Sequence, residues 1–378
     1  MKIVVDENIS FAEEAFSTLG EVTLSHGREI TNEMLRDADA LIVRSITNVN
    51  EELLANSSVK FVGTATIGTD HIHKEYLEQN GINFADAAGC NSHAVKEYVY
   101  TAIFNLCVKH NISLDGKSIG IIGCGNIGSK VALVAESLGI KVYKNDPPLQ
   151  RVGSSNEYCS LDEALQCDII TCHVPLNKGG VDNTVHLLNE SKLNNLKPGT
   201  ILINSSRGPV LDGNALKQRL AKRNDLHVVL DVWETEPNFD TELLKSIELG
   251  SAHIAGYSYE GKVNGTKLIY NALCKNLDQP VNWQPTLAEV GNSILDISDT
   301  KSKEEFFFNL FNNIYPIHED DNLMRKVLNE QVDDVGKYFD KLRKTYRLRR
   351  ELNNYRIKRN MESDSFKDTL NILRIPFV

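Results

Sequence analysis

The chain has 378 residues, of which 41% are hydrophobic and 24% charged, so two or three globular domains with sizeable cores are expected. The net charge of −10 disfavours a nucleic-acid scaffold or an anionic membrane surface as a partner, although a site with local positive charge can still bind an anionic substrate. The seven cysteines are odd in number and contain no Cys-x-x-Cys pair, which indicates neither a disulfide framework nor a zinc site. With no signal peptide and no membrane span evident, we expect a cytoplasmic protein.

Short apolar runs alternate with helical stretches from the amino terminus onward. Four of these runs are predicted to be buried strands: Ile3–Val5, Ala40–Val43, Phe61–Thr64 and Ile82–Ala85. Such alternation is typical of an α/β domain with a parallel sheet. A long helix is then predicted for Ser92–His110, because its apolar residues recur at helical spacing.

A second series of strands and helices follows the long helix. Its strand candidates are Ser118–Ile122, Lys141–Lys144, Asp168–His173, Thr200–Asn204 and His227–Val232. These predict a second doubly wound unit, after which a helical run covers Gly261–Leu277. The character of the chain changes again near residue 281, where a third, smaller domain is expected to begin.

A glycine-rich run lies between the first strand and the first helix of this second unit. It reads Gly123, Cys124, Gly125, Asn126, Ile127, Gly128, which is the G-x-G-x-x-G pattern of dinucleotide-binding folds. Glycines permit a tight turn and close approach to a pyrophosphate, and the helix amino terminus offers free N–H groups. Asp146, at the end of the next strand, would accept hydrogen bonds from the adenine ribose and repel a 2′-phosphate, so NAD is expected rather than NADP. The alternative is an ordinary glycine turn with an unrelated acidic residue.

Three polar segments stand at or near predicted strand ends in the second half of this unit. They contain Arg207 in 204–209, Glu236 in 231–237 and His253 in 251–257. Each residue has an ordinary structural explanation on its own, as a surface ion pair, a solvated loop residue or a structural histidine. Their shared position at the carboxyl ends of strands, downstream of the glycine run, favours a functional set.

These motifs, in this order, resemble the D-isomer-specific 2-hydroxy-acid dehydrogenases, and the resemblance implies that Arg207, Glu236 and His253 are catalytic. A histidine can accept the hydroxyl proton as a 2-hydroxy acid is oxidised, and a carboxylate can orient its ring. An arginine matches a substrate carboxylate or carbonyl oxygen through its planar fork. Hydride transfer needs no metal, and no metal site is expected.

The resemblance also implies an architecture and a set of contacts. The NAD-binding domain (93–253) would be inserted in a flavodoxin-like substrate domain (1–92 and 254–280), followed by a small α+β C-terminal dimerisation domain (281–378). By motif match, the cofactor contacts would include Val174, Ser206, Asp231 and Gly256, and the substrate contacts Arg44, Ser45, Thr66 and Tyr257.

One branch of the family carries such a C-terminal domain, forms homodimers and acts on a phosphorylated four-carbon hydroxy acid. The segments 43–45, 63–72 and 339–346 resemble this branch. Arg44 is the first candidate for binding the phosphate, and the basic stretch Lys341–Arg359 is the second; the alternative for that stretch is a solvated helix face. The rival functions are a dehydrogenase of another hydroxy acid, such as 3-phosphoglycerate or glycerate, and a non-catalytic NAD-sensing protein.

Overall fold

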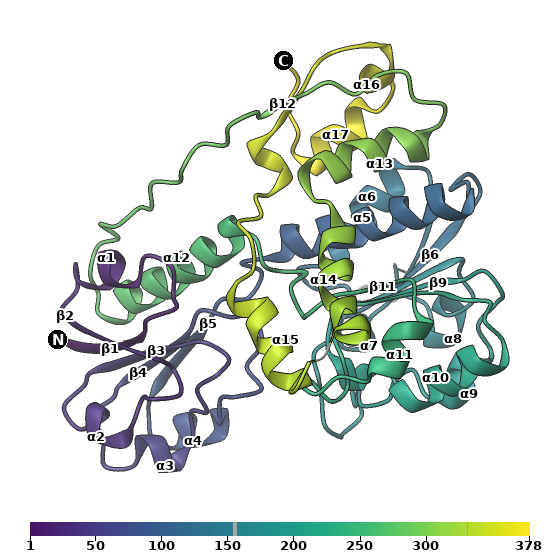
Figure 1. The fold of residues 1–378 in the computed structure, drawn as a ribbon. Helices are drawn as coiled ribbons and strands as arrows, with labels where there is room; N and C mark the ends of the chain where they lie inside the picture. Colours follow the sequence, from purple (N-terminus) through teal and green to yellow (C-terminus); the bar gives the residue numbers. More distant parts are fainter. Residues whose placement is uncertain (154–156, 331) are drawn as a thin grey trace. The chain divides into compact units, whose positions relative to one another are not determined.

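The fold was analysed in a computed structural model that describes residues 1–153, 157–330 and 332–378. The chain forms two compact units, each assembled from two separate segments (Figure 1). The first contains Met1–Asn91 and Ser258–Glu289, and the second contains Ser92–Tyr257 and Val290–Val378. In the described residues, no helix combines the length and the apolar character that crossing a bilayer requires.

The first unit is built on a parallel five-stranded sheet in the order β2-β1-β3-β4-β5. Alternate side chains of these strands enter two separate cores, because successive residues of a strand point to opposite faces. The helices α1 and α12 cover one face, and α2, α3 and α4 cover the other. The strands are β1 (Lys2–Asp6), β2 (Glu21–Ser25), β3 (Ala40–Val43), β4 (Phe61–Thr64) and β5 (Asn83–Asp86); the helices are α1 (Ala12–Phe16), α2 (Asn32–Leu35), α3 (Glu51–Leu54), α4 (Lys74–Gln79) and α12 (Tyr259–Asn276).

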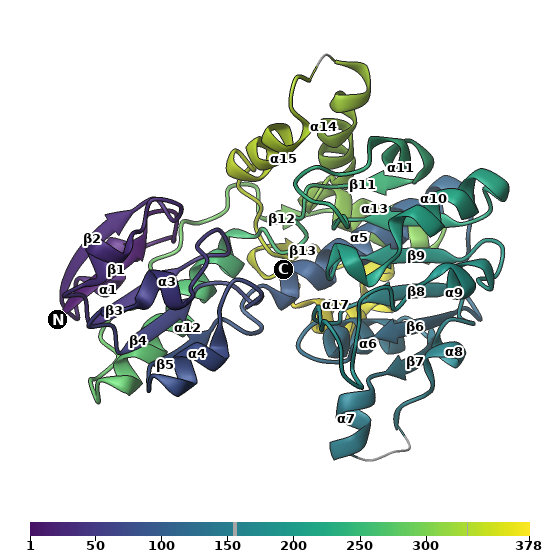
Figure 2. The same ribbon diagram turned by 90° about the horizontal axis from the view of Figure 1, so that it is seen from below.

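The second unit contains a parallel six-stranded sheet in the order β11-β10-β9-β8-β6-β7 (Figure 2). The order reverses direction between β6 and β8, which is the kind of switch point where α/β sheets bind ligands. Its strands are β6 (Ser118–Ile122), β7 (Lys141–Asn145), β8 (Ile169–Cys172), β9 (Ile201–Asn204), β10 (His227–Leu230) and β11 (Leu249–Gly250). Its helices up to β11 are α5 (Ser92–His110), α6 (Gly128–Ser137), α7 (Pro147–Val152), α8 (Leu161–Ala164), α9 (Glu190–Asn194), α10 (Gly213–Lys222) and α11 (Thr241–Ser246), with a 3-10 turn at Gly208–Val210.

The C-terminal segment of the second unit is mostly helical and packs on α5. The ring of Phe104 stacks on Phe307 and Phe311, with centroids 5.0 and 5.7 Å apart, so this segment and α5 share one apolar core. Its elements are β12 (Ile294–Leu295), α13 (Lys303–Ile314), α14 (Ile317–Asn329), α15 (Val335–Lys344), a 3-10 turn at Leu352–Asn354, β13 (Arg356–Ile357), α16 (Met361–Ser365) and α17 (Lys367–Leu373), with β12 and β13 forming a small parallel sheet.

The predicted fold class is confirmed: two doubly wound parallel sheets, and a C-terminal part that combines helices with a small sheet. The strand β2 was not predicted, because its residues are largely exposed and lack an apolar run. The division into three domains stays a prediction, since residues 290–378 form one compact unit with residues 92–257. The seven cysteines are all free thiols.

Candidate active site

Arg207 stands in a short loop that is held by the last residue of β9. The side-chain oxygen of Asn204 accepts hydrogen bonds from the backbone N–H and the hydroxyl of Ser206, at 3.1 and 2.8 Å. The Asn204 amide donates to the carbonyl of Arg207 at 3.0 Å, and the guanidinium donates to the carbonyl of Ser206 at 2.8 Å. The following Gly208 lies so close to Trp233 that an added Cβ would stand 1.9 Å from its carbonyl oxygen. The Arg207 loop therefore packs directly on the segment that leads to Glu236.

Glu236 and His253 form a hydrogen-bonded pair. The two residues come from different loops, and Oε2 of Glu236 lies 2.9 Å from Nδ1 of His253. The side chain of His253 is 31% exposed and that of Glu236 22%, so the pair is partly shielded but reachable. Burial raises the pKa of the Glu236 carboxyl, but the charge and hydrogen bond of His253 and the charge of Arg343 outweigh it, and the pKa lies below its ordinary value. An ionised Glu236 on Nδ1 fixes the ring and leaves Nε2 for a substrate proton.

The loop that carries His253 is held by the buried carboxylate of Asp231. One oxygen of Asp231 accepts from the N–H of Ile254 at 2.8 Å and from the hydroxyl of Ser251 at 2.6 Å. The other accepts from the N–H of Ala255 at 2.9 Å. His253 itself has a left-handed backbone with φ of 54°, a conformation that costs energy for a non-glycine residue. Asp231 thus compensates a strained turn that presents the histidine, and its predicted contact with NAD remains a prediction.

The glycine run forms the turn that the sequence predicts, and its three glycines meet different constraints. Gly123 has φ of 89°, which favours glycine, and a Cβ on Gly128 would lie 2.0 Å from the carbonyl oxygen of Gly123. A Cβ on Gly125 would meet no protein atom within 4 Å, so the space above this residue is open. Helix α6 begins at Gly128, and the N–H groups of Asn126 and Ile127 precede its hydrogen-bonded turns. This open space at a helix amino terminus fits a dinucleotide pyrophosphate.

Asp146 and Val174 lie beside this turn. The carboxylate of Asp146 accepts from the N–H of Cys124 at 2.8 Å and caps α7 through the N–H of Leu149 at 3.0 Å. A Cβ on Gly123 would stand 2.9 Å from a methyl of Val174, so both predicted cofactor contacts border the glycine run. Ser206 is tied to Asn204 as described above, and Gly256 follows the His253 turn; the role of each toward NAD stays a prediction.

Of the predicted substrate residues, Arg44, Ser45 and Thr66 belong to the first unit and Tyr257 to the second. The guanidinium of Arg44 donates to the carbonyl of Asn8 at 3.3 Å, and Ser45 is exposed. The Thr66 hydroxyl lies 2.8 Å from that of Thr64 and donates to the carbonyl of Gly68 at 3.1 Å. These bonds stabilise the turn that follows β4, and the role of Thr66 toward a substrate stays a prediction.

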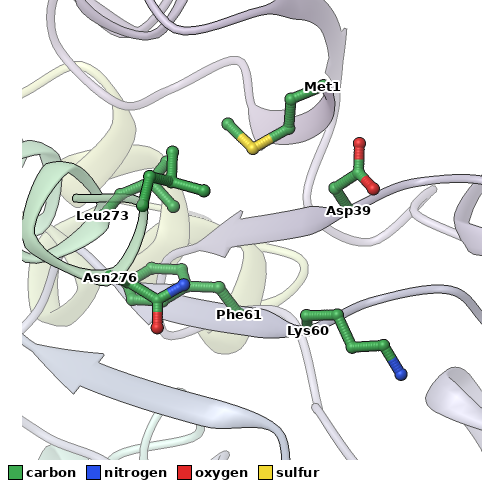
Figure 3. A pocket seen from close by; sticks show the side chains of 7 residues that line it. Met1, Asp39, Lys60, Phe61, Leu273 and Asn276 are labelled. Atoms are coloured by element: carbon green, nitrogen blue, oxygen red, sulfur yellow. The ribbon is translucent and has the colours of Figure 1, made fainter. Parts of the chain in front are cut away.

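A hollow of about 270 Å³ lies elsewhere in the first unit (Figure 3). Asp39 and Lys60 line it, and they stand immediately before β3 and β4. Ligands of open α/β sheets bind at the carboxyl ends of the strands, and this hollow is at the amino ends. It does not coincide with any predicted site residue.

The basic stretch Lys341–Arg359 is not a solvated helix face. Arg349 is 3% exposed and donates to the carbonyls of Ala255 and Ala94 at 3.0 and 2.6 Å, while Arg347 forms an ion pair with Asp320. Only the first residues of the stretch belong to a helix, α15, where Arg343 lies over the ring of Tyr257. The sequence could not separate these roles, because each depends on partners far away in the chain.

Within the described residues, folding also brings together two groups of side chains that could hold a metal ion: His110, His227 and Glu248, and His186, Asp212 and Glu234. In the first group both histidines contact one oxygen of Glu248, at 2.8 and 3.1 Å, and Lys109 contacts the other at 2.6 Å. These contacts already balance the carboxylate charge. The expectation that the protein uses no metal stays a prediction.

Residues 92–255 match the family described as D-isomer specific 2-hydroxyacid dehydrogenase, NAD binding domain, and residues 287–373 match a domain of unknown function, DUF3410. The chain is 44% identical to the erythronate-4-phosphate dehydrogenase of Klebsiella pneumoniae strain 342 and 45% identical to that of Escherichia coli K12 DH10B, with 93% of this chain and 92% of each relative covered. Among solved structures it is similar to NAD⁺-bound 3-phosphoglycerate dehydrogenase from Entamoeba histolytica. That similarity has 27% identity and a TM-score of 0.63, and it covers 76% of this chain and 99% of the other.

Proposed function

This chain belongs to the erythronate-4-phosphate dehydrogenases, within the D-isomer specific 2-hydroxyacid dehydrogenases, and from that premise we propose the reaction that it catalyses. It oxidises 4-phospho-D-erythronate to 2-oxo-3-hydroxy-4-phosphobutanoate, an NAD-dependent step of pyridoxal 5′-phosphate biosynthesis. The single observation that carries the chemistry is the hydrogen bond of 2.9 Å between Glu236 and Nδ1 of His253. It leaves the opposite ring nitrogen for the hydroxyl group that reacts.

When bound, NAD would supply the hydride acceptor, so that the hydrogen and the electron pair of the substrate C2–H bond could leave while the C2=O bond forms. His253 takes the hydroxyl proton on Nε2 and thereby becomes an imidazolium. Glu236, which is ionised, stabilises that charge and keeps the ring in place. Arg207 would bind the C1 carboxylate and the oxygen that becomes the carbonyl, because its guanidinium presents parallel N–H donors.

The glycine run, Asp146 and Val174 would hold the cofactor. Free N–H groups at the start of α6 suit the pyrophosphate, and the carboxylate of Asp146 suits the adenine ribose hydroxyls. Arg44, Ser45, Thr66 and Tyr257 are the proposed substrate contacts. We also propose a cytoplasmic location, which the seven free thiols favour, and a homodimer, whose sedimentation mass would be twice the chain mass of 42.3 kDa.

A substrate panel tests this function directly. The enzyme is mixed with NAD and with 4-phosphoerythronate, 3-phosphoglycerate or glycerate, and NADH is followed by its absorbance. We expect the highest kcat/KM for 4-phosphoerythronate. A higher value for 3-phosphoglycerate would assign the chain to a different substrate within the same chemistry.

Replacing His253 by Ala separates an enzyme from an NAD-sensing protein. We expect turnover to fall by about 100- to 10,000-fold, which is the contribution of general acid–base catalysis by a positioned side chain. NAD binding, measured by calorimetry, should be retained. A variant as active as the wild type would contradict the catalytic role of His253.

A further inference from the structure

Helix α15 packs tightly on the loop that carries Glu236. A Cβ on Gly336, in the first turn of α15, would stand 2.6 Å from the side-chain oxygen of Asn238, so the helix and this loop are in close contact. Further along the helix, the ring of Phe339 packs on Phe239 with centroids 5.7 Å apart. Both contacts fix α15 against residues 238 and 239, immediately after the Glu236 region. The residue one helical turn after Phe339 is therefore held near the hydrogen-bonded pair of Glu236 and His253.

That residue is Arg343. Its guanidinium carbon lies 5.7 Å from the ring centre of Tyr257 and 5.9 Å from that of Phe339. Its Nε is shielded from solvent and has no hydrogen-bond partner in the described residues. No described carboxylate forms an ion pair with it, although Glu236 is near enough for each to shift the pKa of the other.

Other arginines of the same basic stretch have acceptors on several of their N–H groups, whereas the hydrogen-bond partner of the Arg343 guanidinium among the described residues is the Tyr257 side chain, and its Nε has none. Arg347 is paired with Asp320, and Arg349 donates to two backbone carbonyls. A guanidinium carries five N–H donors, and shielding one from water without an acceptor costs free energy. Burial lowers the pKa of Arg343, but the Tyr257 hydroxyl and the Glu236 carboxylate outweigh it and raise the pKa above its ordinary value. The charge is therefore kept, and an anion from outside the chain would satisfy it.

We propose that Arg343 binds the phosphate group of the substrate, next to Tyr257. This assignment rests on the proposed function, in which Arg207 and His253 take the carboxylate and the hydroxyl at the C1–C2 end. The substrate phosphate is then the anionic group of the substrate to which the second unit has not yet assigned a binding residue. A guanidinium suits it, because it donates to phosphate through parallel N–H groups. This contact would give the C-terminal segment a direct role in substrate specificity.

The test compares Arg343→Gln with the wild type on 4-phosphoerythronate and on unphosphorylated erythronate. For the phosphorylated substrate we expect kcat/KM to fall about 10- to 100-fold, mostly through KM, as for loss of a charge-assisted hydrogen bond. For erythronate we expect a change of less than about 3-fold, because that substrate lacks the group Arg343 binds. Arg343→Lys, which keeps the charge but not the planar fork, should recover part of the loss. Lys344→Gln is the matched control, since it removes the same charge from an exposed neighbour and should change nothing.

A second readout does not depend on turnover. Inorganic phosphate should raise the melting temperature of the wild type and of Lys344→Gln, and should leave that of Arg343→Gln unchanged. An equal loss on both substrates, or equal stabilisation of all variants by phosphate, would overturn the proposal and assign Arg343 to the carboxylate or to the scaffold. Failure of the proposed function is a different result: the wild type would then not oxidise 4-phosphoerythronate at all.

Discussion

Asp231 shows how much of this site depends on one buried side chain. Its two oxygens accept three hydrogen bonds from the loop that presents His253 in a left-handed conformation. We predict that Asp231→Asn lowers kcat about 10- to 100-fold, because small displacements of catalytic groups are costly. The side-chain NH₂ group of the new Asn would also point at the N–H of Ala255, where two donors cannot form a hydrogen bond. The free energy of unfolding should therefore fall by about 1–3 kcal/mol.

Steady-state kinetics and urea unfolding measure the two effects of Asp231→Asn separately. The control is Tyr98→Phe, which removes a hydroxyl lying 2.8 Å from Ser251 but leaves all three bonds to Asp231 in place. Unchanged kcat in Asp231→Asn alongside reduced stability would show that this carboxylate supports the fold without positioning His253.

His173 makes stability depend on pH. Burial lowers its pKa to about 3 from an ordinary 6.5, so the unfolded chain binds a proton between these values and the folded chain does not. Stability is therefore full above pH 6.5 and is lost as the pH falls below it. We predict that His173→Asn flattens this dependence by up to about 1.4 kcal/mol per pH unit, measured by urea unfolding between pH 7 and 5.

The control for His173→Asn is the exposed His318, whose replacement by Asn should leave the slope as it is. Some dependence of stability on pH should remain in both variants because of His93. Burial, and to a lesser extent the cations near it, lowers the pKa of His93 to about 3 as well. An identical slope in wild type and His173→Asn would mean that the imidazole is protonated equally in the folded and unfolded states.

At the residue scale, the sequence could predict the site only where a motif carries the signal. Arg207, Glu236 and His253 each stand in a recognisable segment at or near a strand end, but their hydrogen bonds come from the fold. Asp231 was predicted as a cofactor contact, whereas its carboxylate accepts three hydrogen bonds from the His253 loop. Arg343 could be predicted only as one of several cations in a basic stretch. The sequence around it does not indicate that Tyr257 lies beside it.

At the element scale, the glycine run offers a matched pair of substitutions. A Cβ on Gly128 would collide with the backbone of Gly123 at 2.0 Å, whereas a Cβ on Gly125 would occupy open space. We therefore predict that Gly128→Ala lowers the free energy of unfolding by about 1–3 kcal/mol, as overpacking does. Gly125→Ala should keep the stability of the wild type but weaken NAD binding at least about 10-fold, because the methyl group takes the place of the pyrophosphate.

Thermal unfolding and calorimetric titration with NAD distinguish these two glycines. If Gly125→Ala binds NAD as tightly as the wild type, the open space above this residue does not hold the pyrophosphate. If Gly128→Ala is as stable as the wild type, the turn can move away from the added methyl group.

Elements were predictable in proportion to their burial. The central strands β3 and β4 have four buried residues each and appear in the sequence as unbroken apolar runs. Strand β2 lies at the edge of the sheet and pairs with β1 alone, so most of its residues are exposed. Its sequence therefore contains neither an unbroken apolar run nor a clear alternation of apolar and polar residues. The helices of the C-terminal segment were not predicted individually, because their apolar faces pack on partners far away in the chain. Helix α13 packs on α5, about 200 residues earlier, and Phe339 of α15 packs on Phe239.

At the scale of the whole molecule, the stacking of Phe104 on Phe307 and Phe311 bears on the domain organisation. These rings are fully buried and join α5 to α13 across one core. A C-terminal domain with its own core would unfold in a separate step, whereas a shared core couples it to the sheet of the second unit. We predict that Phe307→Ala lowers the unfolding free energy by about 3–5 kcal/mol and shifts the transition of residues 92–257 together with that of residues 290–378.

Hydrogen exchange read by mass spectrometry checks this coupling, because it reports β6 and α17 separately. Loss of protection in both elements by the same free energy is expected for one cooperative unit. The control is Leu323→Ala, which removes an exposed side chain from α14 and should cost less than about 0.5 kcal/mol. Loss confined to α17 would establish residues 281–378 as a domain that folds on its own, as the sequence suggests, and Arg343 would then reach Tyr257 across a domain interface.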